Sequence, residues 1–254
     1  MYEASTLNMQ HFTPATDSIL DNLLPQRRTL GQPPGKHDEP RVKPSGPRPS
    51  DQPRRTRNFI TQVKLASWNV RTMSDTANSK GQAPERRSAL IAKELQRLDV
   101  DIACLSECRI PEEGEFSEGN YTILYSGRGS NQPRLEGVAI ALKTHLRPSI
   151  TNRKGINSTL MTMHIRLEKN CHATVISAYA PTFKRLLDEK ILFYDQLFTI
   201  LAAISKGDRI FLIGDFNARV RCDTTTWPDI IGPNGLGEEN AQGQMLLELC
   251  TRLD

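Results

Sequence analysis

Short apolar runs, most of them followed by polar residues, recur along the chain from residue 63 onward. Runs of roughly four to eight residues that are rich in β-branched and aromatic side chains are typical of buried strands. They predict strands at residues 64–70, 100–105, 121–125, 138–142, 159–167, 173–179 and 210–213.

Apolar residues three and four positions apart predict three helices between and after these strands. The first begins near Pro84 and ends near Leu98, the second covers residues 186–204, and Asn240 caps the last. On the second helix, the stripe expected to face a sheet consists of Leu187, Ile191, Tyr194, Leu197, Phe198 and Leu201. Because strands and helices mix without strict alternation, the pattern predicts an α/β fold, a four-layer sandwich of two mixed sheets flanked by helices.

The chain before residue 63 has a different composition. Residues 27–57 are dense in Pro, Gly, Arg and polar residues, which cannot bury a core. We therefore expect residues 1–62 to form a disordered Pro/Arg-rich arm and residues 63–254 to form the folded domain. The basic run at residues 54–57 is consistent with a nucleic-acid contact or a nuclear address, and equally with a solvated basic linker.

Composition limits the class of protein further. The 254 residues suit one large domain with an appendage, and a net charge of +4 gives no sign of a strongly basic face. Five scattered cysteines favour reduced thiols, and no apolar stretch approaches the roughly 20 residues that cross a bilayer. The amino terminus lacks the pattern of a signal peptide. We expect an intracellular protein, nuclear rather than cytoplasmic, with no membrane partner and no indicated protein partner.

Four of the predicted strands end in polar residues that strand propensity does not require: Asn69, Glu107, Tyr179, and Asp215 with Asn217. Strand ends that converge on one edge form a natural rim for an active site. Each residue also has a simpler explanation, since Asp215 and Asn217 beside Gly214 suit a turn and Glu107 suits a surface carboxylate. If the strand continues, Asp215 and Asn217 face the same side.

These residue types fit the hydrolysis of a phosphodiester. A hard cation such as Mg²⁺ takes oxygen ligands and keeps several waters, so Glu107 is the first candidate for a metal ligand. Asp215 could orient or deprotonate water, or assist the leaving oxygen. Asn69, Asn217 and Tyr179 could donate hydrogen bonds to a phosphate whose charge grows in the transition state.

Taken in order, these motifs resemble the endonuclease/exonuclease/phosphatase superfamily, which includes DNase I and the apurinic/apyrimidinic endonucleases. The stretches that carry the resemblance are Ser67-Trp68-Asn69, Leu105-Ser106-Glu107, Ser177-Ala178-Tyr179-Ala180-Pro181 and Gly214-Asp215-Phe216-Asn217. Within the superfamily, residues 68–73, 125–129, 136–139 and 235–243 are most similar to the endonuclease domains of non-LTR retrotransposons and to a related domain of a host protein.

The resemblance implies a DNase I-like sandwich, dependence on Mg²⁺ or alternatively Mn²⁺, and DNA as the partner and substrate. By the same similarity Glu107 matches the metal ligand, and Asn69 matches a residue beside metal and phosphate. Tyr179 matches a phosphate contact, and Asp215 with Asn217 matches the catalytic pair.

The sequence departs from the family pattern after Asp215. The family places a late Asp on a strand and a terminal Asp-His pair there, whereas all five histidines of this chain precede Asp215. Loss of an acid–base group typically slows a reaction about 10²- to 10⁴-fold. The domain is therefore expected to lack its C-terminal strands, either as a fragment of a longer chain or as a degenerate copy.

Three functions remain open from the sequence. The first is a Mg²⁺-dependent DNA endonuclease of retrotransposon type, with full activity not assumed because the Asp-His pair is absent. The second is a catalytically inactive descendant that acts as a binding protein. The third keeps the chemistry but acts on a phosphoinositide, a sphingolipid or an RNA tail, and the resemblance disfavours it.

Overall fold

The computed structural model describes residues 63–75, 86–168, 171–228, 230–232, 234–235 and 237–253, which all belong to one compact unit. The predicted arm at residues 1–62 and the predicted helix start at Pro84 lie outside these residues. Within the described ranges, none of the helices has the length and apolar character that crossing a membrane requires.

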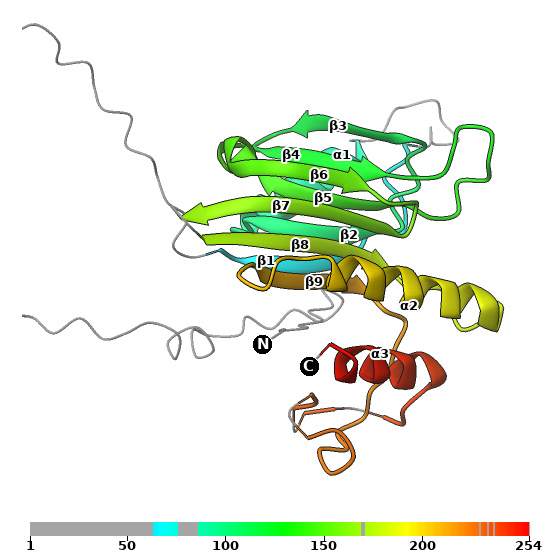
Figure 1. The fold of residues 1–254 in the computed structure, drawn as a ribbon. Coiled ribbons are helices and arrows are strands. Elements are labelled where there is room, and N and C mark those ends of the chain that lie inside the picture. Colours follow the sequence, from blue (N-terminus) through cyan, green and yellow to red (C-terminus); the bar gives the residue numbers. More distant parts are fainter. Residues whose placement is uncertain are drawn as a thin grey trace, which may run out of the picture. The chain divides into compact units, whose positions relative to one another are not determined.

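Five strands form the first mixed sheet, in the order β1-β2-β5-β4-β3 (Figure 1). Strands β1 and β2 are parallel, and the other neighbours are antiparallel. The strands are β1 Leu65–Asn69, β2 Ile102–Ser106, β3 Glu113–Glu118, β4 Tyr121–Ser126 and β5 Val138–Lys143, and the 3₁₀ helix η2 Thr144–Ser149 follows β5. The sequence did not predict β3, because this edge strand is largely polar and exposed.

Four strands form the second sheet, in the order β6-β7-β8-β9. They are β6 Ile150–Gly155, β7 Leu160–Glu168, β8 Cys171–Tyr179 and β9 Arg209–Asp215, of which β8 and β9 are parallel. The edge strand β6 was missed for the same reason as β3, since apart from Ile150 its sequence has no apolar residue.

Strand β9 continues through Gly214 to Asp215, so Gly214 does not end the strand as the sequence suggested. Gly214 pairs with Ala178 of β8, and a Cβ at Gly214 would lie 1.8 Å from the Ala178 carbonyl oxygen. Only glycine permits this close backbone approach. The approach brings Asp215 level with Tyr179, its partner in the strand register.

Three apolar clusters separate four layers, which confirms the predicted sandwich. The first fills the space between the two sheets and includes Ile140, Met163 and Val175. The second packs α1 (Arg87–Arg97) against the first sheet, and the third packs α2 (Leu187–Ala202) and α3 (Ala241–Thr251) against the second sheet. The predicted cap of α3 is also confirmed, since Asn240 Oδ1 accepts the Gly243 N–H at 2.8 Å.

The face of α2 that meets the sheet differs from the predicted stripe. Leu187 and Ile191 are 59% and 44% exposed, so their assignment to the buried face is wrong. The buried residues of α2 are Lys190, Phe193, Tyr194, Leu197 and Leu201. The prediction failed because apolar residues surround much of this helix, and periodicity alone cannot tell which side packs.

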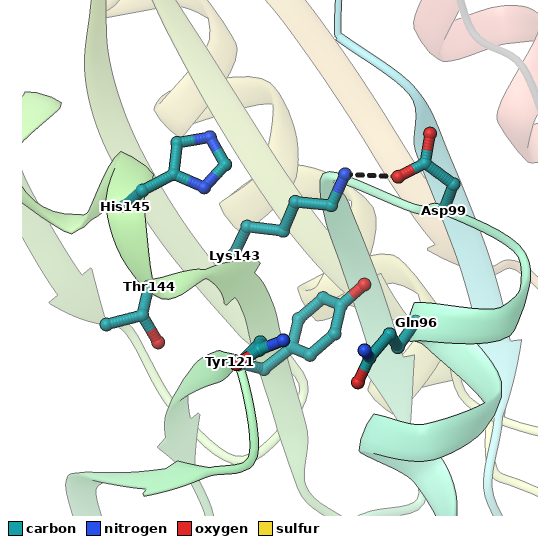
Figure 2. A pocket seen from close by; sticks show the side chains of 7 residues that line it. Gln96, Asp99, Tyr121, Lys143, Thr144 and His145 are labelled. Atoms are coloured by element: carbon teal, nitrogen blue, oxygen red, sulfur yellow. Dashed lines mark hydrogen bonds and ion pairs between the residues drawn. The ribbon is translucent and has the colours of Figure 1, made fainter.

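A polar pocket of about 260 Å³ lies beside the start of β2 (Figure 2). Lys143 Nζ donates to Asp101 at 2.8 Å and to Asp99 at 2.5 Å, and these hydrogen bonds raise the pKa of Lys143. The Tyr121 hydroxyl donates to the Val100 carbonyl at 2.6 Å. These contacts brace the loop before β2, at the opposite end of the strand from Glu107.

Candidate functional site

The predicted polar residues lie at the carboxyl ends of two parallel strand pairs, one from each sheet. Asn69 ends β1 in register with Ser106 of β2, which directly precedes Glu107. Tyr179 ends β8 in register with Asp215 of β9. Hydrogen bonds join Asn69, Glu107, Tyr179 and Asp215 into one group, which we call the strand-end cluster.

Asn69 is the centre of the strand-end cluster. Its Nδ2 lies 2.9 Å from Glu107 Oε1 and 3.0 Å from Asp215 Oδ2, while its Oδ1 accepts the Arg71 N–H at 3.1 Å. Because ionised carboxylates only accept hydrogen bonds, the amide must turn its NH₂ group toward both of them. Asn69 therefore links the two sheets and holds two carboxylates on one nitrogen.

Glu107 receives donors on both of its oxygens. Besides Asn69, the Tyr179 hydroxyl donates to Oε1 at 3.2 Å, and Arg109 Nη2 donates to Oε2 at 2.8 Å. Burial alone would raise the pKa of Glu107, but the hydrogen bonds from Asn69, Arg109 and Tyr179 outweigh it and lower the pKa below its ordinary value. Glu107 is consequently an anion at neutral pH.

Tyr179 is almost fully buried beside these anions. Burial, followed by the negative charges of Glu107 and Asp215, raises the pKa of Tyr179 well above its ordinary value. The phenol therefore stays protonated at neutral pH and remains a hydrogen-bond donor.

Asp215 and Asn217 form a turn as well as part of the cluster. Asp215 Oδ1 accepts the Asn217 N–H at 3.0 Å, and the Asn217 amide donates to the Ala180 carbonyl at 2.8 Å. The strand ends at Asp215, so the expected alternation does not extend to Asn217. The Asn217 side chain thus fixes the connection after β8, and its predicted contact with substrate phosphate stays a prediction.

Four residues in or beside the strand-end cluster have positive φ without being glycine: Arg71, Glu107, Arg109 and Asn217, with φ between 48° and 59°. The left-handed conformation costs roughly 1–2 kcal/mol for such residues, and strain of this kind gathers at functional sites. These left-handed conformations turn the backbone sharply just after the strands end.

Two features of the site were missed from the sequence. Arg109 binds Glu107 directly at 2.8 Å, although the sequence alone made Glu107 equally compatible with a surface carboxylate. Glu136, which lies in one of the stretches that carry the family resemblance, accepts from Arg128 at 2.8 Å, Ser158 at 2.9 Å and Arg185 at 2.9 Å. A lone carboxylate two residues before the buried strand β5 was the available signal.

The cluster has oxygen atoms suited to a hard cation, although no group of three or more His, Cys, Asp or Glu side chains that could hold a metal occurs in the part of the chain that the structure describes. Glu107 Oε2 accepts one hydrogen bond and keeps capacity for a further partner. The Glu107 and Asp215 carboxylates share one neutral amide, and a divalent cation would relieve their repulsion. Because Mg²⁺ needs only one or two carboxylates and keeps its waters, these residues fit it.

The lowered pKa of Glu107 predicts a dependence of stability on pH. A carboxylate whose pKa is depressed in the folded protein stabilises it above the unfolded pKa of about 4.3, and this stabilisation is lost as pH falls through the lower folded value. Below about pH 4.3, wild-type protein should therefore lose free energy of unfolding more steeply than Glu107→Gln. Urea unfolding followed by circular dichroism at several pH values measures this, and parallel curves would contradict it.

A family model described as "Endonuclease/Exonuclease/phosphatase family" matches residues 66–254. Craniofacial development protein 2 from Bos taurus is 31% identical over 186 residues, which cover 73% of this chain. The chain spans only 29% of the length of that relative. This match confirms the predicted resemblance to a host protein.

Solved structures show the same fold. An AP endonuclease from Leishmania major superposes with a TM-score of 0.52 at 13% identity, over 75% of this chain and 66% of that one. An AP endonuclease from Archaeoglobus fulgidus gives a TM-score of 0.50 at 16% identity, over 76% of this chain and 71% of that one. At these identities the likeness concerns the fold alone, and it agrees with the predicted DNase I-like sandwich.

Proposed function

This chain belongs to the endonuclease/exonuclease/phosphatase family, and from that membership we propose that it is a divalent-metal-dependent phosphodiester hydrolase that nicks DNA. The observation that carries the proposal is the Asn69 amide held between the Glu107 and Asp215 carboxylates, at 2.9 and 3.0 Å. Two carboxylates that share one neutral amide repel each other, so the arrangement is unfavourable for stability alone. It suits a site that binds a cation.

The choice of DNA rests on the motifs around the cluster. Residues 68–73 and 136–139 resemble the endonuclease domains of non-LTR retrotransposons, which supports a DNA endonuclease of that type. The solved structures with the same fold include two AP endonucleases, which is compatible with this choice.

Glu107, with Asp215 beside it, would hold the cation, for which Mg²⁺ is the first choice and Mn²⁺ the second. When bound, such an ion supplies positive charge that neutralises the phosphate as negative charge develops in the transition state.

The protein's own side chains perform the remaining work. Tyr179 keeps its proton, which it donates to Glu107 Oε1 at 3.2 Å, and it would turn the same O–H to a phosphate oxygen when substrate is bound. Asn69 holds the Asp215 carboxylate in position through Oδ2, so Asp215 can orient the attacking water and accept its proton. Arg109 adds a fixed positive charge beside Glu107.

Removal of the metal tests the proposal. Supercoiled plasmid incubated with purified protein and Mg²⁺ should be nicked, nicking should stop when EDTA is added, and Mn²⁺ should restore it after EDTA is removed. Glu107→Gln is the control for contaminating nuclease, since a contaminant would nick equally in that preparation. DNA binding without any Glu107-dependent nicking would support the alternative, a catalytically inactive binding protein.

A further inference from the structure

An aromatic side chain projects into solvent directly beyond the strand-end cluster. Phe183 is 76% exposed and lies on a turn four residues after Tyr179. The neighbouring residues Lys184 and Arg185 are basic, and Lys184 is exposed as well. Large aromatic side chains normally bury most of their surface, so one that is exposed and directly followed by two basic residues beside a phosphodiester site is a candidate ligand contact.

The turn that carries Phe183 is held in a fixed position. The Arg185 N–H donates to the Thr182 carbonyl at 3.0 Å. Lys190, which is buried in the first turns of α2, donates from Nζ to the Phe183 carbonyl at 3.1 Å, and its ammonium lies 5.5 Å from the centre of the Phe183 ring. A buried lysine that binds a surface turn keeps the aromatic ring in one place, which lowers the entropy lost when a ligand binds.

The same turn is connected to the catalytic region. Arg185 Nη2 donates to Glu136 Oε1 at 2.9 Å. The same carboxylate accepts from Arg128 Nη2 at 2.8 Å and from Arg128 Nε at 3.1 Å. Glu136 also accepts from Ser158 Oγ at 2.9 Å, and the carbonyl of the next residue, Thr159, accepts the Tyr179 N–H at 2.9 Å, so Glu136 is linked to the strand-end cluster. Figure 1 shows α2 running back along the second sheet from the end at which β8 finishes.

We propose that Phe183 stacks on a nucleobase of the DNA strand whose phosphodiester lies at the strand-end cluster, while Arg128, Lys184 and Arg185 contact the flanking phosphates. This inference rests on the proposed function and names a contact for its substrate. Stacking on an aromatic ring, combined with cations along the backbone, is how proteins hold single-stranded nucleic acid without reading its sequence.

The charge beside the ring is the reason to choose nucleic acid over a protein partner. Lys184 is next to Phe183 in the chain, and two more cations, Arg128 and Arg185, share the Glu136 carboxylate, with Arg185 also 3.5 Å from Glu189, so these cations outnumber their carboxylate partners. Three aliphatic residues of α2, Leu187, Ile191 and Leu192, are also exposed, but the acidic residues Asp188 and Glu189 lie among them in the chain. If this surface bound a protein partner, the affinity would depend on Leu187, Ile191 and Leu192 as much as on Phe183.

Binding of a single-stranded oligonucleotide that contains 2-aminopurine, in EDTA so that no cleavage occurs, tests the inference. Phe183→Ala should weaken binding about 5- to 150-fold, the range expected for loss of one stacked base, and should abolish the quenching of 2-aminopurine fluorescence. Phe183→Trp should bind and quench as wild type does, because it keeps an aromatic face. Phe183→Leu should behave as Phe183→Ala, because it is apolar without a ring.

Leu192→Ala is the matched control, since Leu192 is a 58% exposed apolar residue on α2, the helix that follows the turn, and the affinity of this variant should equal that of wild type. Unchanged binding by Phe183→Ala and Phe183→Leu, equal weakening by Leu192→Ala, or no binding by wild type would each overturn the inference. Plasmid nicking reports on the proposed function separately. If nicking depends on Glu107 but substitution of Phe183 leaves binding unchanged, only this inference is wrong. If binding depends on Phe183 but no nicking occurs, only the proposed hydrolase activity is wrong.

Discussion

Asp215→Asn is expected to slow DNA nicking about 10²- to 10⁴-fold, the usual effect of removing a group that transfers a proton. Asn has nearly the same shape as Asp, so the change removes the negative charge and the ability to accept a proton without leaving a cavity. One hydrogen bond should also be lost. The two Asp215 oxygens accept from Asn69 and from the Asn217 N–H, and an amide has only one oxygen to offer.

Initial rates of plasmid nicking under excess Mg²⁺ measure this effect, with circular dichroism as the check that the variant is folded. Asp195→Asn is the matched control, because it makes the same chemical change on the exposed face of α2, and it should nick at the wild-type rate. If Asp215→Asn nicked as fast as Asp195→Asn, Asp215 would have no role in the reaction and the proposed mechanism would be wrong.

Leu105→Ala should lower the free energy of unfolding by about 2–5 kcal/mol, as truncation of a buried leucine does when the surrounding structure cannot collapse. Leu105 has no exposed surface and lies in β2 between Trp68 of β1 and Ala139 of β5 in the strand register. It packs in the apolar cluster under α1, two residues before Glu107.

Urea unfolding measures the loss. Leu90→Ala provides the comparison, since Leu90 is 47% exposed on α1 and alanine favours a helix, so its effect should stay within about 0.5 kcal/mol. Equal effects of the two substitutions would show that β2 does not lie in a packed core, and the position of Glu107 would then lack its support.

The strands that could be predicted were those with an apolar run. Strands β2 and β5 and most of β8 are buried on both faces, and their mainly apolar sequences indicate such strands directly. The edge strands β3 and β6 escaped prediction because they face solvent and have few apolar residues. The buried face of α2 was predicted only in part, with Tyr194, Leu197 and Leu201 buried but Leu187 and Ile191 exposed, because apolar residues surround much of the helix.

The candidate site, like the fold, could be predicted only in part. The presence of polar residues at strand ends was visible in the chain, and so was their resemblance to a nuclease family. The backbone conformation that turns Glu107 and Asn217, the salt bridge from Arg109 to Glu107, and the position of Glu136 were not visible.

By itself the sequence determined which side chains are able to act in catalysis and which segments must be buried. Both follow from the local composition and from the spacing of apolar residues. Only the tertiary structure decided that Asn69 meets Asp215, 146 positions further along, because that contact depends on how two sheets pack face to face. This contact is set by the close approach of β9 to β8 at Gly214 and by the apolar core between the two sheets. A local sequence pattern cannot specify the distance between segments so far apart in the chain.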